Sequence, residues 1–267
     1  MTHPTPSPTT MTRRHTAADS VTYRLHQAFN GTSQDWPAAR AAILAGAPVD
    51  TPIPAWSGAT QLIIAATSDC FAEINWSLDH GANTEAVCSD GNTTLVHAVV
   101  HGHVAATTLL LDHGANPNAR DRNGTPVLVM ALDHNGHWTM NNALTDLLLD
   151  HGADPNARDW DSWTALMVVT FLNATQSTER FVATLIKHGA DPAATAPGGR
   201  TIPELFMANG RPELTGYLDE ALIGDHRAAA RRRLLNRLTA AQCAAWLPKA
   251  CAAEAAMAVS TAWHRTP

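Results

Sequence analysis

The stretch LLLDHGADPNARDWDSWTAL (147–166) is a near copy of LLLDHGANPNARDRNGTPVL (109–128). Both copies gather aspartate, histidine and asparagine, which include residue types that bind metal ions. The later copy also has two tryptophans, Trp160 and Trp163, where we align an arginine and a glycine in the earlier one. The comparison raises two questions: whether the shared polar residues serve chemistry or architecture, and what the tryptophans do.

The repetition extends well beyond these two copies. Glycine followed by alanine, after an apolar stretch, recurs at steps of 35, 33, 38 and 37 residues, at Gly46, Gly81, Gly114, Gly152 and Gly189. A period near 33 with helical apolar spacing indicates a solenoid. Because no single helix pair can bury its own apolar face, we expect stacking to make the core.

The stretch GNTTLVHAVVHGHVAATTLLLDHGANPNA (91–119) resembles an ankyrin repeat along its whole length. Neighbouring copies begin at GATQLIIAA (58–66), GTPVLVMAL (124–132), SWTALMVVT (162–170) and GRTIPELFM (199–207). The resemblance implies an all-α fold, an ankyrin-repeat solenoid of stacked helix-turn-helix units with a helical C-terminal extension.

The chain is predicted to have three parts. Residues 1–18 are rich in threonine and proline and are expected to form a disordered tail. The ankyrin repeat domain is expected over 19–222 and a basic helical extension over 223–267. The predicted repeats span about 19–50, 51–84, 85–117, 118–155, 156–192 and 193–222.

Each repeat has its own start and stop signals. Threonines are predicted to cap the first helices, namely Thr60, Thr93, Thr125, Thr164 and Thr201. Pro126 is predicted at the first helical position, where its missing N–H costs nothing. The repeat over 124–152 is predicted to lose one residue before Thr125. The recurring glycines are predicted to end the second helices in the left-handed conformation.

The histidines of the repeats favour architecture over metal binding. His80, His113, His151 and His188 each precede the recurring glycine. Equivalent residues of packed helices lie roughly 8–10 Å apart, whereas zinc ligands lie about 2.0–2.1 Å from their ion. We therefore predict that these side chains cap helix carbonyls. A weaker metal candidate is the loop with Asp133, His134 and His137, for which the alternative is an ordinary polar loop.

No sequence motif indicates catalysis or a cofactor, so we predict a non-enzyme without cofactors. Four separate cysteines without C-x-x-C spacing favour free thiols, and hence the cytoplasm or another reducing compartment. We expect no transmembrane segment and no signal peptide, so that secretion would need another route.

The family resemblance implies a protein-binding concave surface, formed by the turns between repeats and the exposed ends of the first helices. The positions carried over include aromatic residues, whose exposure is typical of binding hot spots. The alternative is that the extension or the long loops cover them. The predicted partner-binding residues are Trp160, Asp161, Trp163, Phe171, Leu172, Arg122, Asn123, Asp133, Trp138, Ser89, Asp90, Asn92, His101 and Arg200.

The net charge of −6 conceals an asymmetry. Residues 223–267 hold seven Lys or Arg and two Asp or Glu, a balance of +5, which leaves −11 for the rest of the chain. The basic helix predicted at 225–237 is open to several interpretations: a cap on the last repeat, docking along the acidic solenoid, or contact with nucleic acid or an anionic membrane. In addition, WLPKACAAEAA (246–256) resembles an F-box-like helix in its Leu-Pro start.

The function predicted from these observations is binding of a target protein through the concave surface, which masks or inhibits the target in the manner of an immunity protein or inhibitor. The alternative is an adaptor or effector, whose repeats bind a target while the C-terminal helices recruit other machinery.

Overall fold

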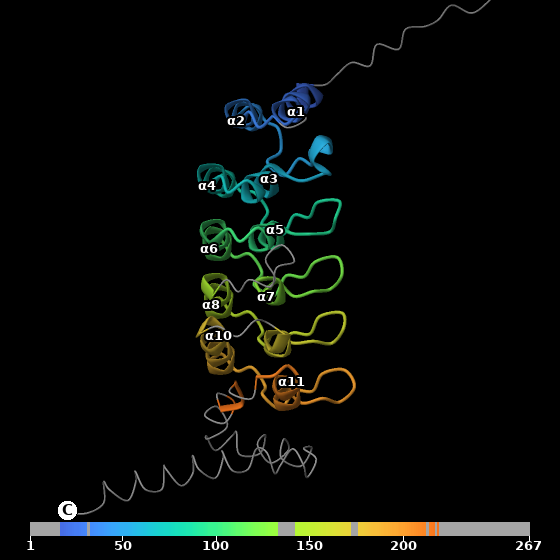
Figure 1. Cartoon of the computed structure of the whole chain (residues 1–267). Helices are drawn as coiled ribbons and strands as arrows, with labels where there is room; N and C mark the ends of the chain where they lie inside the picture. Colours follow the sequence, from blue (N-terminus) through green and yellow to red (C-terminus); the bar gives the residue numbers. More distant parts are fainter. Residues whose placement is uncertain are drawn as a thin grey trace, which may run out of the picture. The chain divides into compact units, whose positions relative to one another are not determined.

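The computed structural model describes residues 17–30, 33–132, 142–171, 176–211, 214–216 and 218. Its regular elements are helices, and the described residues contain isolated β-bridges but no strand. They form two compact units, one up to Thr94 and one from Leu95 onward. Figure 1 shows the helices of each unit arranged in pairs. The predicted all-α architecture of helix pairs is confirmed.

The first unit contains two helix pairs. The pair α1 (Ala17–Ala28) and α2 (Trp36–Leu44) is followed by the short 3-10 helix η1 (Pro54–Trp56), and then by the pair α3 (Gln61–Thr67) and α4 (Phe71–Asp79). A buried apolar cluster joins the two pairs and includes Leu25, Phe29, Ile53 and Ile63. Most of its other members are alanines, which let the helices approach closely.

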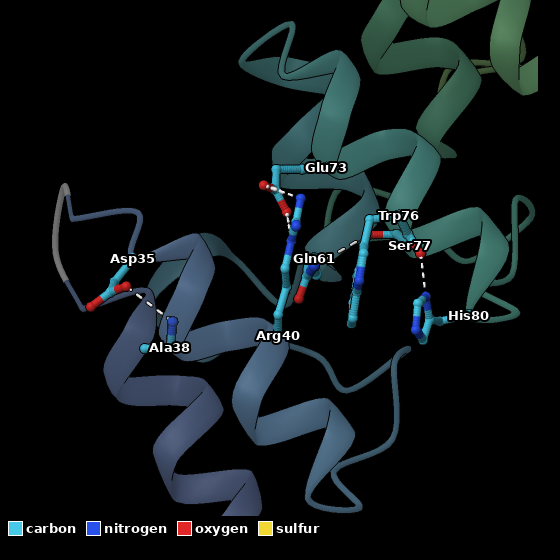
Figure 2. Close-up of polar contacts among 8 residues, drawn as sticks. All are labelled: Asp35, Ala38, Arg40, Gln61, Glu73, Trp76, Ser77 and His80. Carbon is cyan, nitrogen blue, oxygen red and sulfur yellow. Dashed lines mark hydrogen bonds and ion pairs between the residues drawn. The ribbon is translucent and has the colours of Figure 1, made fainter.

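A stack of side chains also ties α2 to α4 (Figure 2). Arg40 donates two hydrogen bonds to the Glu73 carboxylate, at 2.8 and 2.6 Å. The same guanidinium lies 5.4 Å from the ring centroid of Trp76, whose other neighbour is the His80 ring at 3.9 Å. Because Glu73 is only 12% exposed, this ion pair is better shielded from water than a surface pair.

The second unit stacks further pairs in two rows. Its first helices are α5 (Thr94–Val100), α7 (Val127–Met130), α9 (Ala165–Val168), continued by η2 (Val169–Phe171), and α11 (Ile202–Ala208). Its second helices are α6 (Val104–Asp112), α8 (Asn142–Asp150) and α10 (Gln176–Lys187). Packing runs from α7 to α9 to α11 in one row and from α6 to α8 to α10 in the other, which Figure 1 shows as two columns.

The glycine-alanine pairs end the second helices, as predicted. At Gly152, with φ of +89°, the N–H donates to the Leu149 carbonyl, and the N–H of Ala153 donates to that of Leu148. This is a Schellman ending, in which two otherwise free carbonyls gain donors. The same two bonds recur after α2, α4, α6 and α10. The positive φ, and not a lack of room for a side chain, favours glycine here, since no atom lies within 4 Å of an added Cβ at Gly152.

One detail of the predicted register is wrong. The bridges Arg120–Pro126 and Arg158–Thr164 show that the two loops have the same length, so no residue is missing before Thr125. Thr125 therefore corresponds to Trp163, and Pro126 corresponds to Thr164. The repeated threonine suggested the alignment, but the backbone pairing across the loop base fixes the register.

The N-caps of the first helices agree only in part with the predicted threonines. The N-cap of α7 is Pro126, not Thr125, so Pro126 does not occupy the first helical position. Thr60 and Thr201 cap their helices through their hydroxyls, and Thr201 forms a capping box with Glu204. Thr164 is at the N-cap of α9, but its hydroxyl accepts no capping bond.

Several predicted segments fall outside the described residues. They are most of the 1–18 tail, the loop with Asp133, His134, His137 and Trp138, residue Leu172, and the whole extension over 223–267. Helix α1 begins at Ala17, inside the predicted tail. In the part of the chain that is described, no helix is long and apolar enough to cross a membrane.

The stacked core predicts a strong position dependence for a buried charge. Leu148 of α8 is fully buried, whereas Leu44 of α2 is 70% exposed. We expect Leu148→Asp to lower the free energy of unfolding by at least about 3 kcal/mol, because it places a carboxylate among apolar side chains. Leu44→Asp should cost less than about 1 kcal/mol. Urea unfolding followed by circular dichroism measures both, and equal losses would contradict the packing described.

Candidate functional site

The loops that join successive helix pairs form hairpin-like projections, which we call fingers. In the second unit they are residues 116–126, 154–164 and 191–201, and Figure 1 shows them extending from the same side of the first helices. Within one finger, the Asp159 carboxylate accepts the N–H groups of Asp161 and Trp163 at 3.0 and 2.8 Å. Asp121 accepts those of Asn123 and Thr125 in the same way. These aspartates therefore hold the shape of the finger.

Asparagine side chains connect each finger base to the next repeat. The Asn156 amide donates to the Gly189 carbonyl at 2.9 Å and accepts the N–H of Asp191 at 2.7 Å. Asn118 makes the equivalent bonds to Gly152 and Asp154. One side chain thus satisfies a backbone donor and a backbone acceptor at the end of the neighbouring helix.

Arginine side chains link neighbouring fingers nearer their tips. Arg120 donates to the carbonyl of Gly124 in its own finger and to that of Arg158 in the next, at 2.5 and 2.7 Å. Arg158 donates in turn to the carbonyls of Ser162 and Thr195, at 2.6 and 3.3 Å. The three fingers are therefore fixed relative to one another by charged donors.

The histidines before the glycines also serve architecture. His80 and His113 each place Nδ1 within hydrogen-bond distance of a carbonyl in the last turn of their own helix, at 2.7 and 2.8 Å. His151 and His188 lie instead near the aspartates of the preceding repeat, with Nε2 at 3.8 Å from Asp112 and 3.6 Å from Asp150. The first pair confirms the predicted carbonyl capping, and the second pair shows contacts between repeats.

Three aromatic side chains of one repeat lie on the finger side, and we call them the aromatic ledge: Trp160, Trp163 and Phe171. Trp160, in the finger, is 70% exposed, and Phe171, at the end of η2, is 53% exposed. The half-buried Trp163 ring meets the Phe171 ring edge to face, with centroids 5.1 Å apart. Trp163 therefore supports Phe171, while Trp160 and Phe171 present large apolar surface to water.

The finger of the aromatic ledge also carries backbone strain. Ser162 has φ of +66°, a left-handed conformation that disfavours a side chain. The equivalent residues of the neighbouring fingers are Gly124 and Gly199, both with positive φ. Strained residues are enriched at functional sites, so this serine adds a second unusual feature to the same finger.

The remaining predicted residues lie on the fingers or at helix ends. In the second unit, Arg122, Asn123, Asp161 and Arg200 are exposed on fingers. His101, just after α5, is exposed and stacks on His103, with ring centroids 5.7 Å apart.

In the first unit the finger residues Ser89 and Asp90 are exposed and Asn92 is half-buried. Leu172, Asp133 and Trp138 lie outside the described residues.

The described residues contain no group of three or more His, Cys, Asp or Glu placed to hold a metal ion. The candidate Asp133, His134 and His137 is not among them. Cys70 and Cys88 are free thiols. Partial burial, together with the nearby Glu73 and Asp69 carboxylates, raises the pKa of the Cys70 thiol. This environment opposes the thiolate form that a reactive cysteine needs.

The sequence prediction missed the residues that connect the fingers. From the sequence alone, Asn118 and Asn156 have a residue type that suits turns, and nothing within one repeat indicates that they, Arg120 or Arg158 contact the next repeat. A signal was present in the segment NARD, which occurs at both 118–121 and 156–159. Contacts 33 to 38 residues apart, however, depend on the stacking geometry and cannot be read from one repeat.

These connections predict a measurable contribution to stability. Asn156→Ala should lower the free energy of unfolding by about 1–2 kcal/mol, because it leaves a donor and an acceptor of the next repeat without partners. Asn123→Ala is the matched control, since its side chain bonds only within its own finger, and we expect a loss below about 0.5 kcal/mol. Thermal and urea unfolding distinguish the two, and indistinguishable variants would refute the proposed contribution of Asn156.

Comparison with known families agrees with this architecture. A family model described as ankyrin repeats, in three copies, matches residues 25–121. The match covers α2 to α6 and begins within α1. No curated protein matches the chain. The total of six repeats stays a prediction.

Proposed function

Because the chain is an ankyrin-repeat protein, we propose that it binds a partner protein through the fingers of its second unit, with the aromatic ledge as anchor. Ankyrin repeats are generally protein–protein interaction modules and are typically non-enzymatic. The observation that carries the proposal is the exposure of Trp160 and Phe171 on a surface whose fingers are hydrogen-bonded internally and to one another.

The hydrogen bonds that hold the fingers support tight recognition. Association costs less when the binding surface is already ordered, since fewer groups lose freedom. The finger of the ledge is fixed internally by Asp159 and linked to the following finger by Arg158. Exposed tryptophan on such a support is the residue type most often found at the energetic centre of an interface.

We further propose that binding masks the partner, as an inhibitor or immunity protein would. The alternative is an adaptor, in which the basic extension over 223–267 recruits other machinery, and it rests on the charge balance of that segment. The two roles differ in what the extension must do. A masking protein needs only the repeats, whereas an adaptor needs both parts.

Two equally exposed phenylalanines, one in the ledge and one outside it, test whether the ledge binds the partner. Phe171 and Phe71 are both 53% exposed, but Phe71 begins the second helix α4 and lies outside the fingers. We expect Trp160→Ala to weaken partner binding by at least about 2 kcal/mol and Phe171→Ala to weaken it by at least about 1 kcal/mol. Phe71→Ala should change it by less than about 0.5 kcal/mol.

The partner is first captured with the wild-type protein from the native host and identified by mass spectrometry. Calorimetric titration of the purified partner then measures each variant, and circular dichroism confirms that the fold is kept. If Trp160→Ala and Phe171→Ala bind as the wild type does, the anchor lies elsewhere and the proposal fails.

Deletion of residues 223–267 separates masking from adaptor function. A masking protein should keep its affinity for the captured partner and its biological effect on that partner. An adaptor should keep the affinity and lose the effect. Retained melting temperature shows that the repeats still fold, and a large drop would instead support a capping role for the extension.

A further inference from the structure

The fingers on either side of the aromatic ledge each carry an arginine at a position that corresponds to one of the two ledge tryptophans. Arg122 lies two residues after the bridge residue Arg120, just as Trp160 lies two residues after Arg158. Arg200 directly precedes the bridge residue Thr201, just as Trp163 directly precedes Thr164. The three fingers therefore present an arginine, an aromatic centre and another arginine in succession along the stack.

These two arginines differ from the arginines that link the fingers. Arg120 and Arg158 donate to carbonyl groups, whereas Arg122 and Arg200 are exposed and their guanidinium groups have no partner among the described residues. A guanidinium presents a planar fork of donors that matches a carboxylate. Arg122 and Arg200 are therefore available to a ligand.

The centre of the ledge has the opposite charge. Asp161 is exposed next to Trp160, while the neighbouring Asp159 carboxylate is occupied by backbone N–H groups. Asp161 would repel an acidic group placed directly over the aromatic side chains. Acidic groups of a ligand are therefore favoured at the two flanks and disfavoured at the centre.

We propose that the ledge binds an extended protein segment with an apolar residue at its centre and an acidic residue on each side, paired with Arg122 and Arg200. This inference rests on the proposed function and specifies its partner. Two repeat steps of roughly 8–10 Å separate the fingers that carry the arginines, which at about 3.3 Å per extended residue places the two acids about five or six positions apart in the segment.

Two other occupants fit the charges less well. A nucleic acid carries a phosphate at every nucleotide, so its backbone would meet Asp161 between the arginines. The chain's own extension is basic, with seven Lys or Arg against two Asp or Glu, and would place like charges beside Arg122 and Arg200. Both occupants are outcomes that the experiment distinguishes.

The probe is a fluorescein-labelled peptide of about ten residues with a central phenylalanine, a glutamate about three residues to either side, and serine and glycine elsewhere. Its comparison peptides carry glutamine in place of glutamate, or both glutamates directly beside the phenylalanine. Fluorescence anisotropy at low ionic strength measures their affinities for the full chain, since salt screens exposed charge pairs.

We expect the glutamate peptide to bind at least about fivefold more tightly than the glutamine peptide, in line with two exposed charge pairs. The combined change Arg122→Ala and Arg200→Ala should abolish this preference, whereas Arg24→Ala, an exposed arginine of α1, should leave it intact. Asp161→Asn should raise the affinity for the peptide with adjacent glutamates. Trp160→Ala should weaken all three peptides by a similar factor.

The inference is overturned if the glutamate and glutamine peptides bind equally, if neither binds, or if the preference survives loss of both arginines. It is also overturned if oligothymidylate displaces the peptide more effectively than unlabelled glutamate peptide does. Tighter glutamate binding after deletion of 223–267, with the preference unchanged, would identify the extension as a competitor and would support the site.

The failure of this inference differs from the failure of the proposed function. If the captured partner requires Trp160 while the peptides show no glutamate preference, the proposed function stands and the acidic recognition is wrong. If the glutamate preference holds while the captured partner ignores Trp160, the surface recognises acidic segments but is not the anchor for that partner.

Discussion

Each helix pair of this protein has an apolar face that only a neighbouring pair can bury, and the other features of the structure follow from this constraint. Leu110, Leu148 and Leu185 are fully buried because α6, α8 and α10 pack in one row. The row requires each helix to end at a fixed point, which the left-handed glycine provides. It also brings each loop beside the next, so that one side chain can bond to two repeats.

The polar residues of the repeats are therefore mainly structural. Asn118 and Asn156 satisfy backbone groups of the following repeat, Arg120 and Arg158 join the fingers, and the histidines contact carbonyls or aspartates. A cluster of Asp, His and Asn in the sequence resembles a metal site because both kinds of site use the same donor and acceptor groups. In this protein those groups bond to the backbone.

Once the repeated positions hold the fingers, the other finger positions are free to differ between repeats. Arg122, Trp160 and the residues beside them share one scaffold but differ in charge and size. This division explains why Trp160 is exposed although it lies next to strictly structural residues. Ser162 belongs to the same variable set, and its left-handed conformation costs energy that the neighbouring glycines avoid.

The sequence by itself determined the helical repeat, the glycine endings and the finger positions, because each depends on residues within one repeat and on a period that is visible along the chain. It failed at Thr125, where a repeated threonine suggested a gap that the bridge between Arg120 and Pro126 excludes. Only the tertiary structure decided that Trp163 supports Phe171 and that Arg158 reaches Thr195. Those contacts depend on how helices and fingers pack in space, which no local pattern encodes.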